Sequence, residues 1–211
     1  MKRKENIIIE ACVGSLEQCV NAERQGANRL ELCDLLDPDG TTPSEELMRT
    51  VKAAVNIPIR VIIRPRGGNF VYSHVEIEQM KESIRLARKI GMDGVVLGIL
   101  TPGNRLDIEA MKPLINLAKP MNVVVHKAID YTDDPLAEMI RLQEVAGVDG
   151  ILTSGGEPTA RQGAQTLQKM VASQKQIRII AAGKITNENL DETVALIGAS
   201  QYHGKRIVGS I

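Results

Sequence analysis

The chain has 211 residues, of which 43% are hydrophobic and 25% are charged, an ordinary composition for a globular protein. Lys and Arg together number 26, as do Asp and Glu, so the formal net charge is zero, and only 2% of the residues are aromatic. With neither a basic excess nor aromatic side chains for stacking on bases, nucleic acid is excluded as a leading partner.

The N-terminus superficially resembles a signal peptide, because basic residues precede three isoleucines. The apolar run stops at Glu10, which makes it too short for the core of such a peptide. No segment approaches the roughly 20 apolar residues of a membrane span. Three cysteines without ribbon-like spacing fit free thiols in a reducing compartment. We therefore expect a cytoplasmic protein with no membrane partner.

Eight short runs of β-branched residues alternate with stretches of helical character along the chain. The runs begin near Ile7, Arg29, Ile59, Gly94, Asn122, Gly150, Arg178 and Gln201. Each interval fits one strand followed by one helix. No linker rich in Pro, Gly or Ser interrupts them, so we expect one domain over residues 1–211.

Helix starts fall between the first runs. Ser15 precedes LEQCVNAERQGA, and Thr42-Pro43 opens SEELMRTVKAAV. Ser73 and Glu76 form a capping-box pattern before a helical stripe of apolar residues. His74 lies inside this cap, and we expect it on the surface without a functional role.

A glycine recurs about three residues before every second run. Gly26, Gly91, Gly147 and Gly198 are each expected to end a helix. Such turns suit any α/β fold, but regular alternation over eight units favours a (β/α)8 TIM barrel. The sequence ends just past the eighth run, so we expect the eighth helix to be missing. Either a further C-terminal segment or a partner would then complete the outer layer.

Titratable residues occupy equivalent positions near the ends of the runs, where barrel enzymes place their active sites. Alignment of the odd runs brings together Glu10, Arg64, His126 and Ala182. Alignment of the even runs brings together Glu31, Val96, Leu152 and His203. Charged side chains are rarely buried unless they are paired or functional. The catalytic candidates, which we expect to converge at one end of the barrel, are Glu10, Glu31, Arg64, His126 and His203.

Two cysteines follow the glutamates at a spacing of two. If Glu10 and Glu31 face the barrel interior, Cys12 and Cys33 also do so on adjacent strands, because side chains alternate along a strand. A buried thiol is the ordinary interpretation of each cysteine alone, and of Cys19 on the first helix. Two cysteines that each follow a glutamate by two positions on adjacent strands are less well explained by packing alone.

Arginines and glycines after the third run indicate an anion site. Arginine binds carboxylate or phosphate with two parallel hydrogen bonds, and glycine lets the backbone approach a ligand. Loops after strands seven and eight also hold phosphate in many barrels. Alternatively, Arg64 pairs with Glu10 or Glu31 inside the protein. The anion-binding candidates are Arg64, Arg66, Gly67, Gly68, Gly183 and Lys184.

Several motifs occur together and in order: EACVGS, RLELCD, the Gly40-Thr-Thr-Pro-Ser44 loop, IRPRGGNF, VVHKAID and ILTSGG. With these motifs the chain closely resembles the CutC family over nearly its whole length. The resemblance implies a cytoplasmic TIM barrel, historically linked to copper homeostasis and usually oligomeric. It also implies that Cys12 and Cys33 bind Cu(I).

The chain departs from the usual pattern of that family at a few positions. Lys127 and Ile129 replace an arginine and a phenylalanine after the histidine, Asn69 replaces an aspartate, and Lys184 replaces a glycine. Lys127 keeps the positive charge but loses the bidentate fork of arginine. These changes bear on substrate geometry more than on the fold.

Three functions remain open from the sequence. Soft thiolates at Cys12 and Cys33 would suit a Cu(I)-binding homeostasis protein. Alternatively, an enzyme would act on a small anionic metabolite, for example a phosphorylated one, with Glu10 or Glu31 as general base, His126 as acid and Arg64 as electrostatic stabiliser. A purely structural barrel leaves the polar strand ends unexplained. No organic cofactor is indicated.

Overall fold

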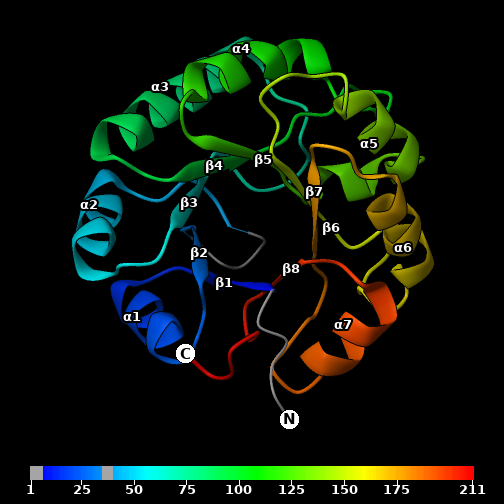
Figure 1. The fold of residues 1–211 in the computed structure, drawn as a ribbon. Coiled ribbons are helices and arrows are strands. Elements are labelled where there is room, and N and C mark those ends of the chain that lie inside the picture. The colour runs from blue at the N-terminus through cyan, green and yellow to red at the C-terminus, as the bar shows by residue number, and fades with distance from the viewer. Residues whose placement is uncertain (1–6, 35–39) are drawn as a thin grey trace.

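Eight parallel strands close into a barrel in a computed structural model that describes residues 7–34 and 40–211 (Figure 1). Each strand pairs with the next in sequence, and β1 pairs with β8 to close the sheet. The strands are β1 (Ile8–Val13), β2 (Arg29–Leu32), β3 (Ile59–Ile62), β4 (Gly94–Leu97), β5 (Asn122–Val125), β6 (Gly150–Thr153), β7 (Arg178–Ala181) and β8 (Gln201–Gly204). The predicted TIM barrel is confirmed.

An outer ring of helices surrounds the barrel (Figure 1). The α-helices are α1 (Leu16–Arg24), α2 (Glu45–Ala54), α3 (His74–Ile90), α4 (Ile108–Ala118), α5 (Pro135–Leu142), α6 (Ala164–Ser173) and α7 (Leu190–Ile197), with a 3-10 helix η1 (Lys127–Tyr131). As expected, no helix follows β8 in the described part of the chain, which runs on to Ile211. The final residues instead reach α1, where Gln25 Nε2 donates to the Ser210 carbonyl over 2.9 Å. None of the helices formed by described residues is long and apolar enough to cross a membrane.

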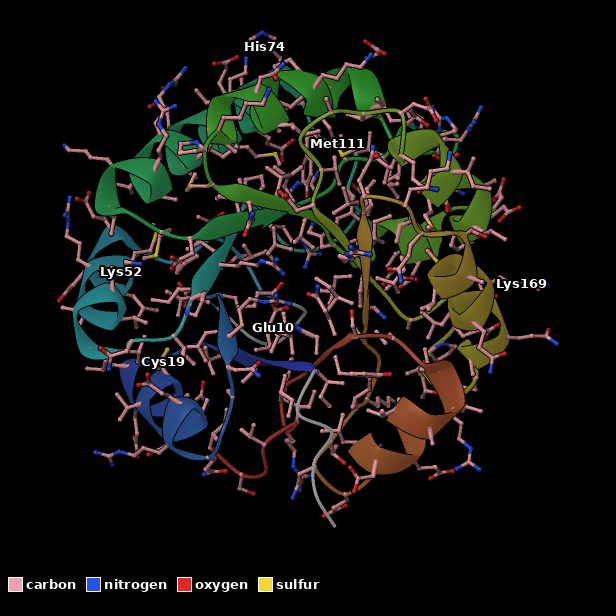
Figure 2. The ribbon with its side chains drawn as sticks, viewed as in Figure 1. Glu10, Cys19, Lys52, His74, Met111 and Lys169 are labelled. Carbon is pink, nitrogen blue, oxygen red and sulfur yellow. The ribbon has the colours of Figure 1, made fainter. Side chains whose placement is uncertain are left out.

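Polar side chains fix the starts of the helices. Ser15 accepts a hydrogen bond from the backbone of α1, and Ser73 and Glu76 form the predicted capping box at α3. The helix α2 is capped by Ser44, one residue after the predicted Thr42-Pro43 opening. His74 is the first residue of α3, is exposed, and lies on the outside of the molecule (Figure 2).

The four recurring glycines set the turns that lead into the even strands. Gly91 and Gly198 cap α3 and α7, while Gly26 and Gly147 lie in turns shortly after α1 and α5. All four have positive φ, between 73° and 95°. This left-handed conformation is strained for other residues, so glycine here reverses the chain toward the next strand.

The inside of the barrel is divided between apolar and polar halves. Side chains of β4 to β7 form an apolar cluster, consisting of Val96, Val124, Leu152 and Ile180 together with Ala182. The remaining strands bury polar side chains instead, and these are Glu10, Arg29, Glu31, Arg60, Gln201 and His203. Because buried charges are costly without partners, a functional site is expected in this polar half.

Candidate functional site

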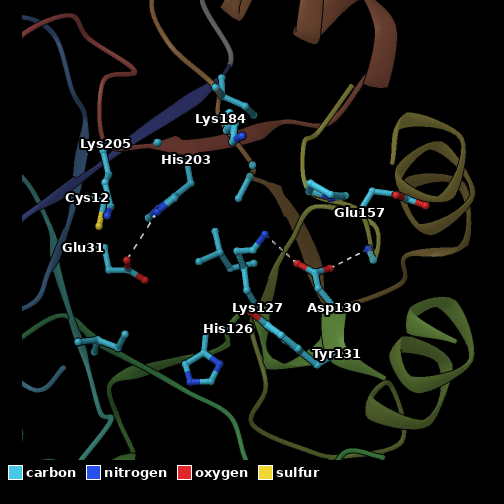
Figure 3. A pocket seen from close by; sticks show the side chains of 18 of the residues that line it. Cys12, Glu31, His126, Lys127, Asp130, Tyr131, Glu157, Lys184, His203 and Lys205 are labelled. Atoms are coloured by element: carbon cyan, nitrogen blue, oxygen red, sulfur yellow. Dashed lines mark hydrogen bonds and ion pairs between the residues drawn. The ribbon is translucent and has the colours of Figure 1, made fainter. Parts of the chain in front are cut away.

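A cavity of about 820 Å³ opens at the carboxyl ends of the strands (Figure 3). Four of the five predicted catalytic residues line it: Glu31, Arg64, His126 and His203. Cys12 lies on the same wall as Glu31 and His203. The structure therefore brings together charged, thiol and imidazole groups around a space large enough for a small molecule.

Glu10, the fifth candidate, lies beneath the cavity at the centre of the barrel (Figure 2). Its carboxylate accepts hydrogen bonds from Arg29 Nε and from Arg60 over 3.2 Å. Its other oxygen lies 2.9 Å from His203 Nδ1. Burial alone would raise the pKa of Glu10, but the hydrogen bond from His203 and the two guanidinium charges hold it well below the usual value. Glu10 is thus a fixed anion that organises its neighbours.

Arg29 and Arg60 are buried partners of the candidate site that the sequence pattern did not identify. Both are buried, and Arg29 also donates to Gln201 Oε1 over 2.7 Å. Period-two alternation could have found them, because Arg29 precedes Glu31 by two positions and Arg60 precedes Ile62 by two. Both arginines lie one layer below the strand ends, where the aligned titratable residues are found.

His203 connects the two glutamates. Nδ1 contacts Glu10, and Nε2 lies 3.6 Å from Glu31 Oε2. Burial opposes a charge on the ring, yet Glu31, Cys12 and Glu10 raise the pKa of His203 well above its ordinary value. His203 is therefore held as an imidazolium between carboxylates.

Glu31 differs from Glu10 in its surroundings. Burial, followed by repulsion from Glu10, raises the pKa of Glu31, whereas His203 and Arg60 oppose this shift. Its Oε1 atom is buried and has no hydrogen-bond partner among the described residues. A carboxylate with a raised pKa and a free oxygen at a cavity wall is suited to exchange a proton or bind a cation.

The two barrel thiols lie next to each other, with 3.6 Å between Cys12 Sγ and Cys33 Sγ. Their depths differ, since the direct neighbour of Cys12 on β2 is Glu31 and Cys33 lies two positions further on. The hydrogen bond with Cys33, burial and the charge of Glu31 raise the pKa of Cys12 well above its usual value. Cys19 is separate, buried on α1 (Figure 2), where burial raises its pKa to about 12.

Arg64 makes neither of the ion pairs considered from the sequence. Its guanidinium donates to the carbonyls of Gly40 over 3.2 Å and Gly68 over 2.8 Å, and it lies 4.7 Å from the Phe70 ring centroid. Arg29 and Arg60 take the place beside Glu10, because they come from the layer of the barrel that contains it. Arg64 instead fastens two loops at the cavity wall.

The other anion-binding candidates separate into two groups. Arg66, Gly67 and Gly68 do not line the cavity, and Arg66 pairs with Glu76 over 2.5 Å. Gly183 and Lys184 do line the cavity, and Lys184 is exposed with a φ of 56°. Apart from Arg64, the lysine and arginine residues that line the cavity come from the loops after β5, β7 and β8, and these are Lys127, Lys184, Lys205 and Arg206.

His126 presents a neutral ring to the cavity. Its Nδ1 accepts from the Ala128 backbone over 3.2 Å, and its buried Nε2 has no partner among the described residues. Burial, reinforced by Arg64, lowers the pKa of His126 to about 3. Because Nδ1 is an acceptor, the ring proton belongs on Nε2, where it can be donated to a ligand.

Lys127 and Asp130 organise the opposite side of the cavity (Figure 3). Lys127 Nζ donates to Ser154 Oγ over 2.6 Å and lies 3.2 Å from Asp130 Oδ2. Asp130 also accepts from the backbone nitrogens of Ser154 and Gly156, each over 2.9 Å. The only signal in the sequence was their place in the VVHKAID motif.

Comparisons with known proteins agree with this architecture. The model of the CutC family matches residues 7–208. The human "Copper homeostasis protein cutC homolog" is 42% identical over 197 residues, which cover 93% of this chain and 72% of that protein. The crystal structure of a CutC protein from Streptococcus agalactiae superimposes with a TM-score of 0.90 at 32% identity, covering 95% of this chain and 99% of that one.

Enzymes with other activities share the fold alone. Thiamine phosphate pyrophosphorylase from Pyrococcus furiosus has a TM-score of 0.64 at 16% identity, with 94% of this chain and 85% of that chain covered. At this identity, the similarity concerns the barrel and carries no statement about substrate.

Proposed function

Because the chain belongs to the CutC family, we propose that it acts in copper homeostasis by binding Cu(I) through Cys12 and Cys33. One observation carries the proposal: the two Sγ atoms lie 3.6 Å apart at the barrel mouth, on neighbouring strands. Two thiols at this separation can reach one ion without a change in the backbone.

The chemistry of these donors fits Cu(I). Thiolates are soft ligands that select Cu(I) over ions that prefer oxygen, such as Mg and Ca. The raised pKa of Cys12 means that its thiol is protonated at neutral pH, so a bound ion would displace that proton. In this proposal Cys12 and Cys33 would hold the Cu(I) ion, and the bound ion would take no part in a reaction.

A Cu(I) competition titration against a chelator, under reducing conditions, tests the proposal. Wild type should bind one Cu(I) per chain. Cys12→Ser and Cys33→Ser should each lose most of that affinity, because one soft ligand is removed. Cys19→Ser is the matched control, since this buried thiol belongs to α1 and should leave the affinity unchanged. Equal affinity in wild type and both barrel variants would remove the proposal.

A second candidate function, acid–base catalysis on a small anionic metabolite, is favoured by the cavity. Its wall combines Glu31, His126 and His203 with the cations Arg64 and Lys184. Of the two carboxylates, Glu31 is the better general base, because it lines the cavity and its pKa is raised. His126 would act as a neutral hydrogen-bond donor through Nε2.

We also propose that the protein is cytoplasmic and that several copies of this chain assemble. A cytoplasmic location is supported by the three cysteines, which are free. Assembly of copies of this chain is supported by the outer ring, in which no described helix lies between α7 and α1 (Figure 1). Sedimentation velocity would measure the oligomeric state.

A further inference from the structure

Three side chains of different chemistry meet on one side of the cavity (Figure 3). Cys12 Sγ, a carboxylate oxygen of Glu31 and a ring nitrogen of His203 all lie within 4.8 Å of one another, and all three residues are buried. They come from β1, β2 and β8, which are neighbours in the closed sheet. A rigid part of the barrel therefore holds them in place.

One carboxylate oxygen of Glu31 is unsatisfied. The residue is only 4% exposed, and its Oε1 has no hydrogen-bond partner among the described residues. A buried carboxylate oxygen without a partner is unfavourable, and native proteins rarely retain one without a reason. A bound cation would satisfy it.

His203 is oriented as metal-binding histidines usually are. Its Nδ1 lies 2.9 Å from Glu10 Oε1, which leaves Nε2 facing Glu31. Metal ligands of this kind commonly donate their second ring nitrogen to a carboxylate, which fixes the ring and its tautomer. Glu10 is in turn fixed by Arg29 and Arg60.

We propose that Cys12, Glu31 and His203 form a site for a divalent cation of the zinc class, which shares only Cys12 with the Cu(I) pair. Sulfur, nitrogen and oxygen ligands together suit such borderline ions. Three protein ligands at a cavity wall leave a further coordination position for water or a ligand, as in catalytic zinc sites. Cation–ligand distances of about 2.0–2.3 Å put tetrahedral ligands about 3.3–3.8 Å apart, so the side chains need to approach by about 1 Å.

Cys33 belongs to the Cu(I) pair and not to this group. Its Sγ contacts Cys12 Sγ and the Val13 carbonyl, the latter over 3.3 Å. It is absent from the group of donor atoms that lie within 4.8 Å of one another. The two sites therefore share Cys12 alone, and variants at the other positions can separate them.

Titration of the purified full chain with Co²⁺, at about pH 8 where protons compete less for the ligands, tests the proposal. Wild type should bind one Co²⁺ with a sulfur-to-cobalt charge-transfer band in the near ultraviolet, and one equivalent of Zn²⁺ should remove the band. Cys12→Ser should abolish it. Glu31→Gln and His203→Asn should weaken Co²⁺ binding at least about tenfold. Cys33→Ser should keep the band.

The same variants titrated with Cu(I) keep the two proposals apart. Glu31→Gln should retain Cu(I) affinity while losing Co²⁺, and Cys33→Ser should do the reverse. Thermal unfolding identifies any variant that fails to fold. If His203→Asn does so, Glu31→Gln decides, because glutamine keeps the shape of glutamate and leaves the contacts of Glu10 in place. A wild type without the cobalt band, or a band lost in Cys33→Ser but kept in Glu31→Gln, would overturn the divalent site and leave the Cu(I) proposal standing.

Discussion

At the scale of single residues, the barrel contains a buried network in which one carboxylate forms ion pairs with two guanidinium groups. Glu10 is 1% exposed and contacts Arg29, Arg60 and His203. Such a network contributes little net stability over an apolar core, but removal of one member leaves its partners charged and unpaired. The network thus fixes His203 and makes the barrel sensitive to any change at Glu10.

Glu10→Ala should lower the free energy of unfolding by about 3–5 kcal/mol, because two buried guanidinium groups lose their counter-ion. Urea denaturation at neutral pH measures this change. The control is Glu45→Ala, which removes an exposed ion pair with Arg49 on α2 and should cost less than about 1 kcal/mol. Similar costs for the two variants would show that Glu10 is not the counter-ion on which the network depends.

At the scale of elements, the loop after β7 combines an unusual backbone with a cation at the cavity. Gly183 and Lys184 both have positive φ, at 106° and 56°. The loop is tied down at both residues, since Ala160 N donates to the Gly183 carbonyl and Asn189 Nδ2 to that of Lys184. A non-glycine residue in this conformation is uncommon. We therefore infer that the side chain of Lys184 has a function at the cavity.

Lys184→Gly should reduce the stabilisation that inorganic phosphate gives the folded protein. Phosphate that binds only the folded state raises the melting temperature, and removal of Lys184 weakens this binding. Without phosphate the variant should melt no lower than wild type, because glycine adopts positive φ without strain.

Differential scanning calorimetry with increasing phosphate measures this effect. Lys169→Ala is the control, because this lysine is exposed on α6 on the outside of the barrel (Figure 2). A full phosphate shift in Lys184→Gly would contradict an anion site at the loop after β7.

At the scale of the whole molecule, stability depends on pH through groups that the fold shields from solvent. His126 is buried beside Arg64 and Phe70, with Asp130 as the nearby acidic group. Its pKa falls from 6.5 to about 3 on folding. Between these values the unfolded chain binds a proton that the folded chain does not, so stability decreases as the pH falls.

His126→Asn should flatten the pH dependence of stability between about pH 6.5 and 3. Asparagine keeps an acceptor for the Ala128 backbone but cannot take up a proton. Over this window wild type should lose up to about 1.4 kcal/mol per pH unit relative to the variant. Urea denaturation at several pH values tests this, and parallel curves for the two proteins would contradict a neutral buried His126.

Much of the fold was accessible from the sequence, because periodicity and turn residues act locally. Alternating runs and recurring glycines predicted all eight strands, with the starts displaced by at most one residue. The same patterns placed Glu31, Arg64, His126 and His203 at strand ends, and the structure brings all four to one cavity. Chain direction and strand order are sufficient to predict that side chains at these strand ends lie at the same end of the barrel.

The partners of those side chains were decided only by the tertiary structure. Arg60 and Arg178 hold the same position in the odd runs, yet Arg60 is buried against Glu10 while Arg178 is exposed. Strand stagger in the closed barrel places Glu10 beside Arg29 and Cys12 beside Glu31, so residues aligned by sequence lie at different depths. Register depends on closure of all eight strands at once, and a pattern local to each strand contains no information about it.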